Sequence, residues 1–151
     1  MGTEFKILID NDSRENSSFA AKAAFDEAIR LNSIFSDYDA DSELSKLSNS
    51  SYKNRKVRLS EELFEVLEFS KSLANKTDGA FDPTLGQLSR LWRIARFRKS
   101  LPINASIERA MNSVGYQHLV LNKPLREATL LKPGIILDLG GIAKGYTADR
   151  M

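Results

Sequence analysis

The alternation of apolar and polar residues from Thr3 to Asp10 predicts a β-strand. Phe5, Ile7 and Ile9 occupy every second position, so their side chains would share one face of the strand. The polar run "NDSREN" that follows predicts the end of the strand.

The spacing then changes from two residues to that of a helix between Ser17 and about Phe35. Apolar residues recur at Ala21, Phe25, Ala28 and Ile29. Ser17 or Ser18 could cap the first turn, because a serine hydroxyl accepts a hydrogen bond from a free backbone N–H there. The pattern therefore predicts a helix of about five turns.

A second helix is expected from Ser60 to about Lys76, where a cap precedes two carboxylates that favour the positive end of the helix dipole. The turn "TDGAFDPTLG" follows it. Pro83 could open a further helix that runs to about Phe97, since proline is tolerated in the first helical turn.

The last third of the chain predicts a helix from Ser106 to Val114, then the strand "HLVLN". The segment "REATLLKPGIILDL" predicts two strands joined by a turn at 132–134, because Pro-Gly favours a β-turn. Helices and strands do not alternate regularly. We therefore expect an α+β fold, a mixed α/β domain that occupies residues 1–151 as a single unit.

Composition excludes several kinds of chemistry. The 151 residues contain no cysteine and one histidine, so disulfides, thiol catalysis and multi-histidine metal sites within the chain are excluded. The net charge of +2 is too small to imply a polyanionic partner by bulk electrostatics. His118, beside a predicted strand, is interpreted as a partly exposed structural residue.

The segment "GIILDLGGIAKG" has the chemistry of an anion site. An apolar strand that leads through two glycines into a helix exposes backbone N–H groups that can hold a phosphate, and Lys144 would add a full positive charge. The alternative is a plain strand-to-helix turn whose glycines only permit close packing. Asp138 favours a site, because a carboxylate that ends an apolar strand needs a partner.

Two acidic segments have both a structural and a functional interpretation. "TDGAFDPT" is either an ordinary turn or a rigid loop that presents carboxylates to a ligand. "DYDADSELSKLS" resembles a calcium loop, but Ser42 stands where the sharp turn needs glycine and Ser48 where the closing glutamate belongs. A helix start capped by Asp41 or Ser42 is favoured there, and Tyr38 could stack on a planar ligand.

The segment "RLWRIARFRKS" mixes cations with aromatic residues, as nucleic-acid and acidic membrane surfaces do. Helical spacing places Leu88, Leu91, Trp92 and Ala95 on one face. Arg90 and Arg93 would then face solvent on the opposite side, which favours a solvated helix over a nucleic-acid surface.

Together these segments resemble the amino-terminal half of the FAD:protein FMN transferase family. The resemblance rests on four segments in order: "MGT", "FSDYDADSELSKLS", "DGAFDPTLGQLSRLW" and "LDLGGIAKGYTAD". It implies a bacterial, Mg²⁺-dependent enzyme that transfers FMN from FAD to a threonine or serine hydroxyl of a target protein and releases AMP. The implied partners are FAD and a protein of the redox-complex subunit type, with no nucleic acid.

The resemblance also assigns roles to individual residues. Positions that match flavin contacts of the family are Met1, Tyr38, Ala80, Phe81, Asp82, Asp138 and Lys144. Gly141 matches the residue whose backbone carbonyl helps to coordinate magnesium. The resemblance assigns no catalytic residue within the chain.

The family's remaining metal ligands, an aspartate and a threonine, lie downstream of the region that matches this sequence. We therefore expect an incomplete domain that is weakly active or inactive by itself. The alternatives are a module that binds or carries FAD without transferring FMN, and a basic interaction domain. The resemblance implies a periplasmic or cell-envelope location, with membrane association only through an anchor upstream of Met1.

Overall fold

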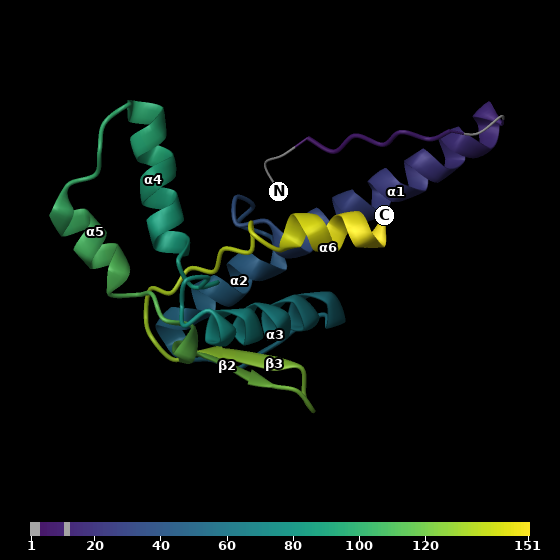
Figure 1. Ribbon diagram of the computed structural model, residues 1–151. Helices are drawn as coiled ribbons and strands as arrows, with labels where there is room; N and C mark the ends of the chain where they lie inside the picture. The colour runs from purple at the N-terminus through teal and green to yellow at the C-terminus, as the bar shows by residue number, and fades with distance from the viewer. Residues whose placement is uncertain (1–3, 11–12) are drawn as a thin grey trace.

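The computed structural model describes residues 4–10 and 13–151, and Figure 1 traces the path of the chain. Its helices are α1 (Arg14–Phe35), α2 (Glu43–Ser50), α3 (Glu61–Lys76), α4 (Gly86–Arg98), α5 (Asn104–Met111) and α6 (Ala143–Arg150). The strands are β1 (Val57–Arg58), β2 (Leu119–Asn122) and β3 (Glu127–Leu130), and short 3-10 helices span Ser51–Lys53 and Tyr116–His118. The predicted mixed α+β fold is confirmed.

The strands form one small antiparallel sheet in the order β1-β3-β2. Leu119 pairs with Leu130, and Val57 pairs with Ala128. Along β3 every second side chain is buried, as expected for a sheet that covers a core with one face. β3 is therefore the central strand of the sheet, and its buried side chains face the core.

The core lies between this sheet, α1, α2, α3 and α6 (Figure 1). Its fully buried large side chains include Leu31, Leu44, Leu47, Leu63, Leu67, Leu119, Leu130, Ile135, Leu137 and Leu139. Phe35 of α1 meets Tyr146 of α6 edge to face, with ring centroids 5.5 Å apart. The C-terminal helix is thus packed on the first helix, and the loop before it is held against the core.

Local capping signals place two helix starts correctly. The hydroxyl of Ser60 accepts a hydrogen bond from the N–H of Leu63 at the start of α3, as predicted. Ser42 caps α2 in the same way. The prediction for α1 is wrong by one turn, because Ser13, not Ser17 or Ser18, accepts the capping bond from the N–H of Asn16.

The predicted first strand is absent from residues 4–10, and Thr3 lies outside the described residues. This segment pairs with no strand within the described ranges, and Leu8 is exposed. An extended segment becomes a strand only when its backbone N–H and C=O groups find a partner. Its alternating pattern is real, but the required neighbour is missing from the described part of the chain.

The predicted pair of strands before Asp138 is half correct. The first half forms β3, whereas residues 135–139 form no strand and make one parallel bridge, between Leu85 and Ile136. These residues are instead held by side-chain and isolated backbone bonds, such as the one from the Leu137 N–H to the Ser48 hydroxyl at 3.1 Å. A buried apolar run has the same sequence pattern whether it pairs as a strand or is buried without strand pairing.

α4 and α5 begin at other residues than predicted. α4 starts at Gly86, three residues after Pro83, because the residues between them form a turn, and the Gly86 N–H bonds to the Ile136 carbonyl at 2.9 Å. α5 starts before the predicted Ser106 and ends at Met111. The two helices form a hairpin that projects away from α3 and the sheet (Figure 1). No helix within the described ranges is long and apolar enough to cross a membrane.

Candidate functional site

A cavity of about 540 Å³ lies where three segments meet: the loop after α1, the inner face of α4, and the loop before α6. The residues that line it include Ser36, Asp37, Tyr38, Leu88, Trp92, Arg93, Arg96, Asp138, Gly140 and Lys144. This volume lies in the ordinary range of small-molecule and cofactor sites. Three of the residues that sequence similarity assigns to flavin, Tyr38, Asp138 and Lys144, therefore line one hollow.

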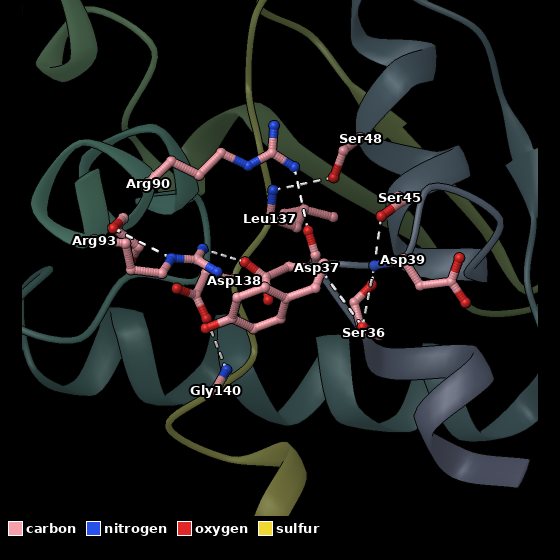
Figure 2. A network of polar contacts seen from close by, with 12 residues as sticks. Ser36, Asp37, Asp39, Ser45, Ser48, Arg90, Arg93, Leu137, Asp138 and Gly140 are labelled. Carbon is pink, nitrogen blue, oxygen red and sulfur yellow. Dashed lines mark hydrogen bonds and ion pairs between the residues drawn. The ribbon is translucent and has the colours of Figure 1, made fainter. Parts of the chain in front are cut away.

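The loop that carries Tyr38 is fixed by buried serines. The Ser36 hydroxyl accepts hydrogen bonds from the backbone N–H groups of Tyr38 and Asp39, at 3.3 and 3.2 Å. The Ser36 carbonyl accepts one from the Ser42 hydroxyl at 2.5 Å and another from the Ser45 hydroxyl at 3.3 Å. These contacts, drawn in part in Figure 2, restrain the backbone of the loop from Ser36 to Asp39.

Two arginines of α4 bind the same loop from the other side of the cavity (Figure 2). The Arg93 guanidinium forms an ion pair with the Asp37 carboxylate, whose side chain is only 11% exposed. Its carbon Cζ also lies 4.3 Å from the centre of the Tyr38 ring, as in a cation–π contact. Arg90 donates to the Asp37 carbonyl at 3.3 Å.

Burial by itself would lower the pKa of Arg93, but hydrogen bonding and Coulomb attraction from Asp37, with a smaller contribution from Tyr38, outweigh it and raise the pKa. Arg93 therefore remains a fixed positive charge in the cavity wall. The prediction that both arginines face solvent is wrong for Arg93, because the long-range partner Asp37 draws it inward, whereas Arg90 is exposed as predicted. Arg93 is 26% exposed at its side chain.

The loop before α6 supplies the opposite wall. Asp138 accepts a hydrogen bond from the N–H of Gly140 at 2.8 Å, while its own N–H donates to the Pro83 carbonyl at 2.8 Å. The Lys144 ammonium donates to the Gly140 carbonyl at 2.7 Å. The Asp138 carboxylate was expected to need a partner, and the N–H of Gly140 in the same loop is that partner.

Asp82 has a different environment from Asp138. It is buried, and its two oxygens accept hydrogen bonds from the backbone N–H and hydroxyl of Thr84 and from the N–H of Tyr116, at 2.6–2.9 Å. The carboxylate ties the "DGAFDPT" turn to the segment after α5. Its contacts are those of a structural residue.

Phe81 lies beside the Asp138 loop, and neither Phe81 nor Ala80 lines the cavity. A Cβ atom added to Gly141 would come within 3.3 Å of the Phe81 ring, so the two loops are in close contact. Ala80 is exposed. Met1 lies outside the described residues. The assignment of these residues to flavin, and of Gly141 to a metal, stays a prediction.

Sequence reasoning missed Asp37, Trp92, Arg93 and Arg96 as members of one site. The signal was present in α4, because Ser89, Trp92, Arg93 and Arg96 recur with the period of one helical face. The apolar residues of this helix, which have the same spacing, predicted a buried face instead. In the structure, Gly86 is the only residue of α4 that is fully buried.

Comparisons with known proteins agree with the four ordered segments. The FAD:protein FMN transferase of Klebsiella pneumoniae is 36% identical over 95 residues, which cover 63% of this chain and 30% of that protein. The one of Chlamydia pneumoniae is 32% identical over 120 residues, 80% of this chain and 38% of that protein. The chain therefore spans between about a third and a half of the length of the proteins it matches.

Solved structures show the same fold. The ApbE protein of Thermotoga maritima superimposes with a TM-score of 0.79 at 32% identity, covering 92% of this chain and 45% of that one. The flavin transferase ApbE of Vibrio cholerae, as its H257G mutant, gives a TM-score of 0.80 at 23% identity, with 94% and 48% covered, and supports the fold alone. The ApbE family model matches residues 1–151, and the chain therefore belongs to the ApbE family.

Proposed function

We propose that this chain forms the FAD-binding part of an FAD:protein FMN transferase, an activity that moves FMN from FAD to a threonine or serine hydroxyl of a protein. The observation that carries the proposal is the cavity of about 540 Å³ between the Tyr38 loop, α4 and the Asp138 loop. It combines aromatic rings with cations, as a flavin linked to a pyrophosphate requires. The names of the relatives supply the reaction.

Each wall of the cavity has a distinct task in this proposal. Tyr38 and Trp92 offer ring faces to the planar parts of FAD. Arg93, Arg96 and Lys144 offer charge and hydrogen bonds to the phosphates, and an arginine fork matches two phosphate oxygens at once. Asp138 orients a hydrogen-bond donor of the ligand through the carboxylate oxygen that Gly140 does not use.

The proposed transfer is a displacement at phosphorus. The hydroxyl oxygen of the acceptor attacks the phosphorus of the FMN half and forms a new P–O bond, while the bond from that phosphorus to the bridging oxygen breaks. AMP leaves with the bridging oxygen, and the hydroxyl proton passes to solvent. Preorganised cations stabilise the negative charge that develops on the phosphate oxygens, which is the main contribution a protein makes to such reactions.

A magnesium ion would neutralise part of the pyrophosphate charge when bound. Within the described ranges, no group of three or more acidic or histidine side chains could hold a metal ion. Magnesium usually takes only one or two protein ligands and completes its octahedron with water and substrate phosphates. The described donors are thus compatible with magnesium that arrives with FAD, with Gly141 as the proposed backbone ligand.

Titration of FAD into the purified chain, with and without Mg²⁺, tests the proposal. Flavin fluorescence reports binding, and chromatography reports AMP. Arg96→Ala should weaken FAD binding about tenfold or more, the usual effect of losing one charge-assisted hydrogen bond. Arg98→Ala is the matched control, because Arg98 lies two residues away on α4 and does not line the cavity.

If Arg96→Ala and Arg98→Ala weaken FAD binding equally, the assignment of the cavity is contradicted. It is also contradicted if neither Arg96→Ala nor Asp138→Ala changes saturable FAD binding. FAD binding without AMP supports the alternative, a flavin-binding module. AMP together with a fluorescent acceptor protein that survives a denaturing gel supports transfer.

A further inference from the structure

The far end of the α4–α5 hairpin exposes large apolar side chains to solvent. Phe97 is 90% exposed, Leu101 82% and Ile103 70%. Lys99 ends α4 in the left-handed conformation, with φ of 52°, and the chain turns back toward α5. We call residues 94–103 the hairpin tip. Figure 1 shows that this turn lies at the end of the hairpin farthest from α3 and the sheet.

The hairpin tip belongs to a segment with charge of one sign. Between Pro83 and Ile107 the sequence contains five cations and no acidic residue. The cations are Arg90, Arg93, Arg96, Arg98 and Lys99. Arg93 forms an ion pair with Asp37, but Arg98 and Lys99 have no salt bridge within the described residues. The tip therefore presents uncompensated positive charge beside its apolar side chains.

A hollow of about 460 Å³ lies next to the exposed apolar residues. Its walls come from Trp92, Ala95, Arg96, Lys99, Ser100 and Leu101. A tryptophan and two cations around a small hollow suit the headgroup layer of a bilayer, where amphipathic rings and basic side chains concentrate. Trp92 and Arg96 also line the candidate FAD cavity, so the two hollows share one helix.

We propose that the hairpin tip docks on the surface of an anionic lipid bilayer, with Phe97, Leu101 and Ile103 in the boundary between headgroups and acyl chains. Apolar side chains within a basic surface are what interfacial helices use for this purpose. Nucleic acid is the poorer match, because Leu101 and Ile103 have no ring on which a base could stack. The proposal does not depend on FAD binding, and it adds a contact to the anchor that the family resemblance implied.

The intrinsic fluorescence of Trp92 can report contact between the hairpin tip and a bilayer. Trp92 is the only tryptophan in the sequence and is partly exposed beside the tip. Vesicles of phosphatidylcholine mixed with phosphatidylglycerol should shift its emission to shorter wavelength, protect it from acrylamide and sediment with the protein. Vesicles of phosphatidylcholine alone should give a much weaker effect, because each Lys or Arg near an anionic surface contributes about a fivefold gain in partitioning.

Variants separate the apolar from the charged contribution. Phe97→Ser should lower partitioning about tenfold, since burial of one phenylalanine is lost. Arg98→Gln with Lys99→Asn should lower it about 25-fold, at about fivefold per cation, and asparagine tolerates the left-handed conformation at position 99. Phe19→Ser on α1 is the matched control, because Phe19 is 78% exposed far along the chain and should leave binding unchanged.

Circular dichroism checks that each variant remains folded. The proposal is overturned by absent binding to the anionic vesicles, by equal binding to neutral vesicles, or by equal losses in Phe97→Ser and Phe19→Ser. It is also overturned if inorganic phosphate reproduces the fluorescence shift, or if single-stranded DNA binds more tightly than the vesicles do.

Discussion

Replacement of Ser42 by alanine tests how the Tyr38 loop is held. Ser42 is completely buried, and its hydroxyl has two partners. It accepts a hydrogen bond from the N–H of Ser45 at 3.0 Å and donates one to the carbonyl of Ser36 at 2.5 Å. The first bond caps α2, and the second fixes the loop that follows α1.

The expected loss of unfolding free energy is about 2–3 kcal/mol. Loss of a helix cap costs about 1 kcal/mol, and a buried carbonyl deprived of its donor costs about 1–3 kcal/mol. The carbonyl of Ser36 keeps a weaker donor, the Ser45 hydroxyl at 3.3 Å, so the lower half of that range applies. Ser60→Ala is the matched control, because Ser60 caps α3 through one bond of 3.2 Å and should lose only about 1 kcal/mol.

Urea titrations of the parent chain and both variants measure these differences. The slope of the free energy with urea should not change, because the folded state buries the same surface. If Ser42→Ala and Ser60→Ala lose equal free energy within about 0.5 kcal/mol, the bond to Ser36 contributes nothing and the reasoning fails. A larger loss for Ser42→Ala, accompanied by weaker FAD binding, would tie the buried serines to the site.

Two further tests use the start and the surface of helices. Gly86→Ala should destabilise the chain by roughly 1–3 kcal/mol, since its Cβ would lie 2.6 Å from the carbonyl oxygen of Ile136. Gly145→Ala adds a Cβ that meets nothing within 4 Å, so it should stabilise α6 by up to about 1 kcal/mol. Equal effects of the two substitutions in a thermal melt would refute this contrast. Burial, and then the hydrogen bond to Glu65, raise the pKa of Tyr146 to about 12. Because the folded pKa lies above the unfolded value of about 10, stability from neutral Tyr146 is present below pH 10 and is lost as the pH rises to about 12. Tyr146→Phe should abolish that loss, which denaturation at each pH measures.

The sequence was most informative where a structure depends on nearby residues. The caps at Ser42 and Ser60 could be predicted because a hydroxyl and the N–H it serves are three residues apart. The first strand could not, because pairing depends on a partner that the pattern of residues 3–10 does not identify. Residues 135–139 had the apolar content of a strand, yet one bridge to Leu85 is all the pairing that the structure describes for them.

The candidate site was predictable in part for the same reason. Similarity of short segments singled out Tyr38, Asp138 and Lys144, which the fold then brings to one cavity. The ion pair between Asp37 and Arg93 joins residues 56 positions apart, so no local pattern could reveal it.

The hydrogen bond between Ser48 and Leu137 joins residues 89 positions apart and has a consequence for how the chain folds. Closing so long a loop costs entropy before any contact compensates for it, and such contacts slow folding. Helices α1 to α3 lie close together in sequence and can collapse early, whereas the wall that carries Asp138 must arrive from far along the chain. We therefore expect the cavity to form only when this long-range contact closes, so ligand binding should not recover before the core does during refolding.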